Sequence, residues 1–250
     1  MILIIIFGQR VGLLLLVLTA TALGLREFYR LTLPDNGSGE QTVGIALGLC
    51  FPFVAHFSRG GELVALLVAV LFVVFLLFLA RPKRLTTVTS NMPILLFGIL
   101  YVPFLLSHAI LLRKEPLGIQ WVFFLLMTVW AGDTSAYFVG TVIGKHKLYP
   151  AISPKKTVEG LLGGLAGSLI VAALLRSLFI RSLPWCHTVI LASAILILGQ
   201  TGDLGESMIK RAVNAKDSSG LIPGHGGVLD RLDSFLFAAP FVYYYVVLVC

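Results

Sequence analysis

Charged side chains are scarce in this sequence. Aspartate, glutamate, lysine and arginine make up 12% of its 250 residues, whereas 58% of the residues are hydrophobic. A soluble domain carries about 25% charged residues. The composition therefore excludes an ordinary water-soluble domain and predicts an integral membrane protein.

Other features are missing as well. The three cysteines, Cys50, Cys186 and Cys250, are widely separated and form no metal-type pair, so we assign them no function beyond apolar packing. The first residues do not read as a signal peptide with a cleavage site. No inverted repeat with matched broken helices is evident, although many transporters have one.

The net charge of +7 comes without a soluble basic domain or an aromatic-interleaved basic patch, which excludes nucleic acid as the partner. Membrane topology explains the charge better, because cytoplasmic loops collect lysine and arginine. Eight spans place thirteen of the nineteen basic residues on one side of the membrane. The loops around 140–157 and 202–232 lie on that side, so we expect both to face the cytoplasm.

Several hydrophobic stretches approach the length that crosses a bilayer, about 20 mainly apolar residues. These stretches are residues 11–25, 43–57, 63–80, 92–112, 119–139, 158–180, 186–201 and 234–250. The sequence therefore predicts an all-α fold, a polytopic bundle of about eight transmembrane helices.

Acidic residues divide the chain by composition. Seven of the twelve lie after residue 115. We therefore expect residues 1–115 to supply N-terminal transmembrane helices and residues 116–250 to form a C-terminal catalytic region.

The first polar cluster surrounds Asp133, near the cytoplasmic end of a strongly apolar helix. A carboxylate within a span usually faces a bundle interior or a watery cavity and marks a functional path. The plainer alternative is an interfacial aspartate capped by Thr134 and Ser135. The cost of a carboxylate at this depth favours the functional interpretation.

The second cluster contains four lysines in the loop before the sixth span, namely Lys145, Lys147, Lys155 and Lys156. An ammonium is a compact donor, and four of them suit a ligand with several phosphates. A loop that faces lipid headgroups is the alternative. The Ser-Pro-Lys-Lys-Thr order, with Glu159 starting the next helix, favours a structured site.

The third cluster is the densest and begins at Asp203. If residues 203–213 are helical, Asp203, Ser207 and either Lys210 or Arg211 share one face. Asp230 and Asp233 are likewise three residues apart at the start of the last helix. Carboxylate and hydroxyl oxygens on two such faces suit Mg²⁺, which also keeps waters and substrate phosphates as ligands.

A glycine-rich turn precedes that last helix and contains His225, Gly226 and Gly227. Glycines let backbone amides approach a phosphate closely, and a helix start favours an anion. An interhelical loop whose opposite charges pair with one another is the alternative. Charge pairing does not require the Gly-His-Gly-Gly turn, so we favour a catalytic site.

These clusters form a long and specific pattern. Ser207-Met-Ile-Lys210-Arg211 is followed by Lys216-Asp217-Ser-Ser-Gly-Leu-Ile-Pro-Gly-His-Gly-Gly-Val-Leu-Asp230-Arg231-Leu-Asp233. The pattern resembles the signature of the phosphatidate cytidylyltransferases, also called CDP-diacylglycerol synthases. Residues 144–160 and the Arg-Glu-Phe-Tyr-Arg-Leu segment at 26–31 are similar to two further stretches of that family.

The resemblance implies that CTP and phosphatidic acid react to give CDP-diacylglycerol and pyrophosphate, a step of phospholipid biosynthesis. It also implies a homodimer whose polar cavity opens to the cytoplasm and the bilayer. Mg²⁺ is the expected cofactor, and a second cation such as K⁺ is left open.

The resemblance and the spacing together assign roles to individual residues. The expected catalytic residues are Asp203, Lys210, Arg211, Asp230 and Asp233. The expected metal ligands are Asp203, Ser207, Asp230 and Asp233. The residues expected to bind the substrates are Asp133, Lys145, Lys147, Lys155, Lys156, Ser207, Lys216, Asp217, His225, Gly226, Gly227 and Arg231.

One departure from the family concerns the N-terminus. The family usually has a full hydrophobic helix before the one that ends in Glu-Phe-Tyr-Arg-Leu, whereas only residues 1–7 occupy that place here. We therefore expect the first helix of the family to be missing or very short. The compact length and the lack of a transit segment predict a bacterial inner (plasma) membrane.

Two other functions remain as alternatives. An ion-coupled transporter or channel would use Asp133, Asp203 and Asp230 as a cation path, but most of the acids lie in one polar segment beside lysines that repel cations. A phosphotransferase acting on CDP-alcohols would show an Asp-Gly-x-x-Ala-Arg helix, and this sequence has no such pattern.

Overall fold

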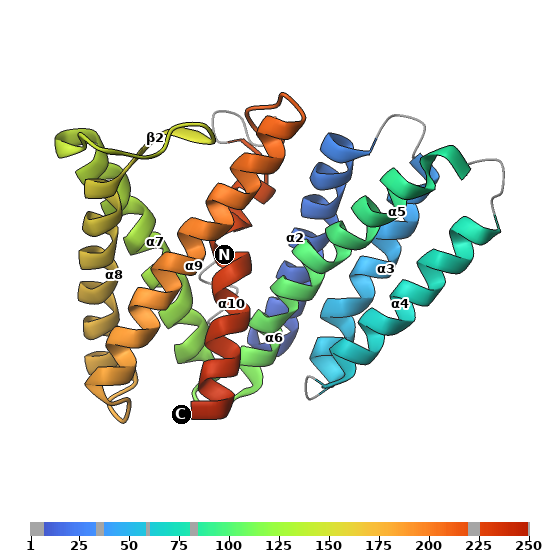
Figure 1. The fold of residues 1–250 in the computed structure, drawn as a ribbon. Helices are drawn as coiled ribbons and strands as arrows, with labels where there is room; N and C mark the ends of the chain where they lie inside the picture. Colours follow the sequence, from blue (N-terminus) through green and yellow to red (C-terminus); the bar gives the residue numbers. More distant parts are fainter. Residues whose placement is uncertain (1–7, 34–37, 59–60, 81–84, 220–225, 250) are drawn as a thin grey trace. The chain divides into compact units, whose positions relative to one another are not determined.

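The structure is a computed structural model that describes residues 8–33, 38–58, 61–80, 85–219 and 226–249. Nearly all of these residues are helical (Figure 1). The helices are α2 (Gln9–Thr32), α3 (Ser38–Phe57), α4 (Gly61–Leu79), α5 (Leu85–Ile99), the π-helical segment η3 (Leu100–Phe104), α6 (Leu105–Lys114), α7 (Gly118–Ile143), α8 (Val158–Phe179), α9 (Trp185–Ala212) and α10 (Leu229–Val249). A two-stranded hairpin, β1 (Lys147–Tyr149) and β2 (Ser153–Thr157), joins α7 to α8.

Within these described ranges, eight helices are long and apolar enough to cross a membrane, with α5, η3 and α6 together forming the fourth span, Thr86–Lys114. The predicted all-α multi-pass bundle is thus confirmed. In the seventh helix, α9, the apolar run ends near residue 201 and the helix continues to Ala212, so the condition that residues 203–213 are helical holds almost to its end. The expected loss of the first family helix concerns residues 1–7, which lie outside the described part of the chain.

By packing, the chain forms two compact units. Unit 1 comprises Met1–Leu111 and Asp217–Asp230, and unit 2 comprises Leu112–Lys216 and Arg231–Cys250. The described residues 217–219 and 226–230 thus pack with the N-terminal helices. The expected division by chemistry, at residues 1–115 and 116–250, stays a prediction, because packing does not test where catalysis takes place.

Small residues bring α7 and α8 together in unit 2. A Cβ atom added at Gly164 would lie 3.0 Å from the carbonyl oxygen of Gly132 and 3.1 Å from Cβ of Ala136, and one at Gly160 would lie 2.8 Å from the Ala136 carbonyl oxygen. Lipid tails are as apolar as leucine, so helices in a bilayer associate through close packing of this kind. A hydrogen bond of 3.2 Å from Ser168 Oγ to the Thr128 carbonyl supports the same contact.

Aromatic packing organises unit 1. Tyr29 is fully buried, and its hydroxyl donates to the carbonyl of Leu95 at 2.8 Å. Gly44 and Gly98 lie against its ring, where a larger side chain would collide. The C-terminal half of α2 is therefore held firmly against α3 and α5, and this half also carries Glu27.

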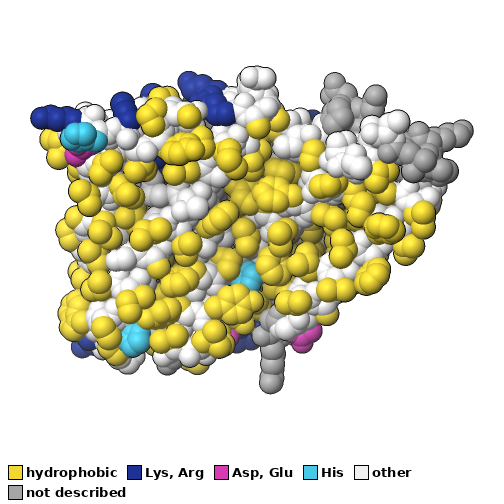
Figure 2. All heavy atoms as spheres, viewed as in Figure 1, with side chains coloured by type: hydrophobic (Ala, Val, Ile, Leu, Met, Phe, Trp, Pro, Cys, Tyr) yellow, Lys and Arg dark blue, Asp and Glu magenta, His cyan; other side chains and the backbone are white. Residues whose placement is uncertain are grey.

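The surface agrees with a membrane environment. Hydrophobic side chains cover most of the face shown in Figure 2. On α4, Phe72, Leu76 and Leu79 are each at least 60% exposed, which water would disfavour and lipid tails would not. The protein is a multi-pass membrane protein.

Replacing Gly164 with leucine tests the α7–α8 contact. The side chain would clash with the α7 backbone, and overpacking of this kind costs about 1–3 kcal/mol. We expect the apparent melting temperature of the purified protein in detergent to fall by several degrees. Gly205→Leu is the matched control, because a Cβ atom at Gly205 meets no other atom within 4 Å. Equal melting temperatures for the two variants would contradict the packing argument.

Candidate active site

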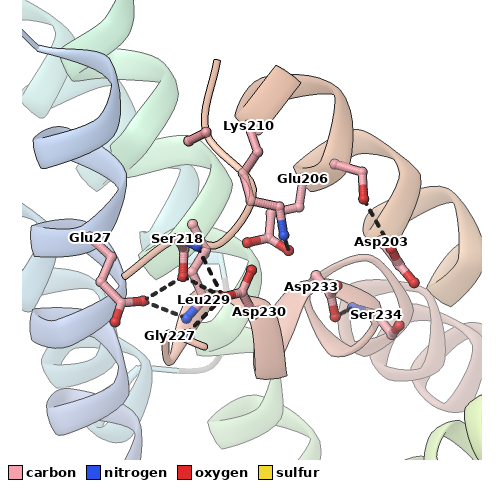
Figure 3. Close-up of polar contacts among 12 residues, drawn as sticks. Glu27, Asp203, Glu206, Lys210, Ser218, Gly227, Leu229, Asp230, Asp233 and Ser234 are labelled. Carbon is pink, nitrogen blue, oxygen red and sulfur yellow. Dashed lines mark hydrogen bonds and ion pairs between the residues drawn. The ribbon is translucent and has the colours of Figure 1, made fainter. Parts of the chain in front are cut away.

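The last part of α9 carries the polar side chains of the third cluster. Ser207 Oγ donates to Asp203 Oδ1 at 3.4 Å, as the four-residue spacing predicted. Glu206 and Lys210 form an ion pair of 3.1 Å, and the side chain of Glu206 is only 1% exposed (Figure 3). The apolar span thus continues without a break into a charged helix end.

Carboxylates from α7 and α10 face the same region of unit 2. Asp133 accepts a hydrogen bond from Gln200 Nε2 of α9 at 3.1 Å and another from the Ser234 side chain of α10. It therefore faces the bundle interior, and its functional role stays a prediction. Asp133, Asp203 and Asp233 lie close enough for their charges to repel one another. Such a cluster is costly within a membrane and attracts cations.

Close packing of α9 on α10 positions Asp233. A Cβ atom added at Gly202 would collide with the carbonyl oxygen of Asp233, and one at Gly199 would lie 3.3 Å from Cβ of Ser234. Asp233 Oδ1 also accepts a hydrogen bond of 2.6 Å from the Ser234 amide (Figure 3). The glycines of α9 thus allow the part of α10 that carries Asp233 and Ser234 to pack closely against α9.

The hairpin between α7 and α8 brings a lysine to this cluster. Lys156 Nζ lies 2.8 Å from Asp203 Oδ2, and the two side chains are 16% and 30% exposed. The second and third sequence clusters therefore meet in unit 2. Lys145, Lys147 and Lys155 are exposed on the same loop, and Figure 2 shows blue side chains gathered at this end of unit 2.

Glu159 and Thr157 hold the hairpin at the start of α8. The Glu159 carboxylate accepts hydrogen bonds from the amides of Lys145 at 3.0 Å and His146 at 3.1 Å, and also contacts the His146 ring. Thr157 Oγ1 caps the helix by accepting from the Gly160 amide at 3.1 Å. The loop is thus ordered, with Glu159 in the first turn of α8, while its role as a phosphate-binding site stays a prediction.

Unit 1 contains a second polar centre, which the sequence analysis missed. Glu27 of α2 is 4% exposed. Its Oε1 accepts from the Val228 amide at 3.0 Å and from Ser219 Oγ. Its Oε2 accepts from the Leu229 amide at 2.8 Å and from Ser218 Oγ at 3.2 Å (Figure 3). The sequence did offer a signal for this centre, because Glu27 is an acid inside an apolar helix and belongs to the 26–31 segment that resembles the family.

Asp230 belongs to the same centre. Its Oδ2 accepts three hydrogen bonds, from the Ser218 amide at 3.0 Å, Ser218 Oγ at 2.9 Å and the Gly227 amide at 2.7 Å. Gly226 has a φ of +76°, a conformation that favours glycine. The anions at this helix start are thus carboxylates of the chain itself. Phosphate binding by Gly226 and Gly227 stays a prediction.

The remaining predicted residues lie near these two centres in the sequence. Lys216, Asp217 and Arg231 are exposed. Arg211 donates to the Ala215 carbonyl at 3.2 Å and so closes the end of α9. His225 lies outside the described residues.

The donor set decides whether a metal ion fits. Across the described ranges, no three histidine, cysteine, aspartate or glutamate side chains form a ready-made metal site. Mg²⁺ needs no such cage, since it is commonly held by one or two carboxylates together with waters and substrate phosphates. The hard oxygens of Asp203, Asp233 and Ser207 in unit 2 suit that ion.

Comparisons with known proteins agree on one family. The model of the cytidylyltransferase family matches residues 1–249. A phosphatidate cytidylyltransferase of Bacillus subtilis (strain 168) is 40% identical over 146 residues, which are 58% of this chain and 54% of the relative. A protein of the same name from Staphylococcus aureus (strain COL) is 48% identical over 127 residues, 49% of this chain and 47% of the relative.

A third relative gives a similar result. The phosphatidate cytidylyltransferase of Staphylococcus saprophyticus is 43% identical over 145 residues, 58% of this chain and 55% of the relative. The chain spans about half the length of the curated relatives it matches. Because the family match extends over almost every residue, the chain belongs to the cytidylyltransferase family.

Proposed function

We propose that this protein is a CTP-dependent nucleotidyltransferase, a phosphatidate cytidylyltransferase that converts CTP and phosphatidic acid into CDP-diacylglycerol and pyrophosphate. The observation that carries the proposal is the meeting of Lys156 with Asp203 at the polar end of a membrane helix, beside Asp133 and Asp233. Family membership and the names of the relatives support it. The transporter alternative gains no support from these matches.

In this reaction, an oxygen of phosphatidic acid forms a bond to the α-phosphorus of CTP. The bond from that phosphorus to the oxygen bridging the α- and β-phosphates breaks, and its electron pair leaves with pyrophosphate. The attacking group is already an anionic phosphate, so the reaction needs no strong general base. Catalysis then consists mainly of in-line positioning and charge stabilisation.

The lysines of the hairpin would supply much of the positive charge. Lys156, half-buried beside Asp203, would contact the triphosphate near the reacting phosphorus. The exposed Lys145, Lys147 and Lys155 would neutralise outer phosphates. Lys210, Arg211, Lys216 and Arg231 would act on the triphosphate and phosphatidic acid, while Asp217 would orient a cation or the sugar.

Asp203, Asp233 and Ser207 would hold Mg²⁺, which would neutralise developing phosphate charge. Asp230 lies one turn before Asp233 on α10. The role of Asp230 as a further ligand of Mg²⁺ stays a prediction. The binding of a second cation such as K⁺ also stays a prediction. Asp133 would support this group through its hydrogen bonds to Gln200 and Ser234.

The proposed setting is the bacterial inner membrane, with the hairpin facing the cytoplasm. Thirteen basic residues on one side of eight spans support this orientation. CTP would enter from the cytoplasm and phosphatidic acid from the bilayer. A homodimer is proposed from the resemblance to the family.

The activity is tested with purified protein in detergent mixed with phosphatidic acid and labelled CTP. We expect labelled CDP-diacylglycerol and pyrophosphate in equal amounts. Chelation of divalent ions should stop the reaction and added Mg²⁺ should restore it, because the oxygens of Asp203, Asp233 and Ser207 suit that ion. Folded protein that forms no product with any divalent cation would refute the proposed function.

Asp203→Asn tests the carboxylate that pairs with Lys156. We expect turnover to fall by about 100-fold or more, since even residues that only support metal ligands cost about 10–100-fold when changed. The matched control is Glu62→Gln, which neutralises an exposed acid at the start of α4. Initial rates and thermal melting of both variants are compared, and near-normal turnover in Asp203→Asn would exclude the assigned role.

A further inference from the structure

Glu27 is an acid inside a membrane helix, and its four donors come from another part of the chain. Two are the hydroxyls of Ser218 and Ser219, and two are the amides of Val228 and Leu229. Burying a carboxylate is costly unless hydrogen bonds replace its water. Here Oε1 accepts from Val228 and Ser219. Oε2 accepts from Leu229 and, when the Ser218 hydroxyl is not turned to Asp230, from Ser218.

The two amides explain why an acid is present. The first N–H groups of a helix have no partner within the helix, and a negative charge near them is favourable. Glu27 accepts from Val228 and Leu229 at the start of α10, directly before Asp230. A residue of α2 thus determines how the last helix begins.

Ser218 connects Glu27 to Asp230. Its Oγ lies 3.2 Å from Glu27 Oε2 and 2.9 Å from Asp230 Oδ2, and its amide donates to the same Asp230 oxygen. A hydroxyl has a single proton, so it donates to one carboxylate at a time. The two acids therefore share one donor, and a displacement of Glu27 would move the groups that hold Asp230.

We propose that Glu27 is a positioning residue for the transfer of the cytidylyl group. By binding residues 218–219 and residues 228–229 together, Glu27 fixes the orientation of Asp230. This proposal rests on the proposed function, because it takes Asp230 as a residue of the reaction. Glu27 acts through the loop and does not contact substrate. Misplacement of a reacting group by about 1 Å can cost about 100-fold in rate.

Glutamine is the most informative replacement. Glu27→Gln keeps the size of the side chain but replaces one acceptor oxygen with an NH₂ donor. The hydroxyls of Ser218 and Ser219 can rotate to accept from it, but the amides of Val228 and Leu229 cannot. At least one of these amides therefore loses its partner.

Glu40→Gln is the matched control. Glu40 lies in the same unit, is 3% exposed and accepts from Asn91 Nδ2 of α5 at 2.9 Å. Glu40 is thus a buried acid of a membrane helix that accepts from the side-chain amide of Asn91, which lies outside the 217–230 segment. The change measures the general cost of removing a buried carboxylate from unit 1.

The experiment uses the full chain in lipid nanodiscs and measures kcat, KM for CTP, thermal melting and hydrogen exchange of peptides covering residues 226–230. For Glu27→Gln we expect kcat to fall by at least about tenfold, with KM for CTP within about threefold of wild type. Exchange at residues 226–230 should rise, and melting should match Glu40→Gln. Ser219→Ala combined with Glu27→Gln should cost less than the sum of the single changes, because the two side chains share a bond.

Other outcomes would overturn the proposal in different ways. Unchanged exchange at residues 226–230 would show that Glu27 does not hold the segment. Increased exchange with unchanged kcat would show that Glu27 holds residues 226–230 but does not position Asp230 for the reaction. An inactive wild-type protein would refute the proposed function and with it the catalytic role of Glu27, while the exchange result would still show whether the anchor exists.

Discussion

Polar groups within a bilayer must find partners inside the protein, because the hydrocarbon core offers none. In this chain the constraint falls most heavily on acids carried by apolar helices. Asp133 is bonded by Gln200 and Ser234, and Asp203 pairs with Lys156. The cost of placing carboxylates at this depth is therefore met by specific neighbours, which also determine where each carboxylate points.

Side chains also bind backbone amides at both polar loops. Glu27 accepts from the unpaired amides at the start of α10, while Glu159 accepts from amides before β1 and Thr157 caps α8. Glu27 and Thr157 thus bind amides at a helix start that would otherwise need water, while Glu159 holds the amides that follow α7. A loop anchored in this way can present lysines or aspartates in a defined orientation, which phosphoryl-type transfer requires.

Glycine makes these arrangements possible in unit 2. Gly132, Gly160 and Gly164 let α7 and α8 approach closely, and Gly199 and Gly202 do the same for α9 and α10. Dense helix packing therefore supports the carboxylate cluster from two directions. The site depends on backbone contacts as much as on its charged side chains.

Hydropathy by itself determined the all-α class and the eight spans, since the length of an apolar run is a local property that the bilayer selects directly. Helical spacing also predicted the contact of Ser207 with Asp203. The meeting of Lys156 with Asp203 and the hydrogen bonds of Glu27 appeared only in the tertiary structure. The reason is physical: Glu27 and Ser218 are 191 residues apart, and their hydrogen bond exists only because packing within unit 1 brings the two segments together.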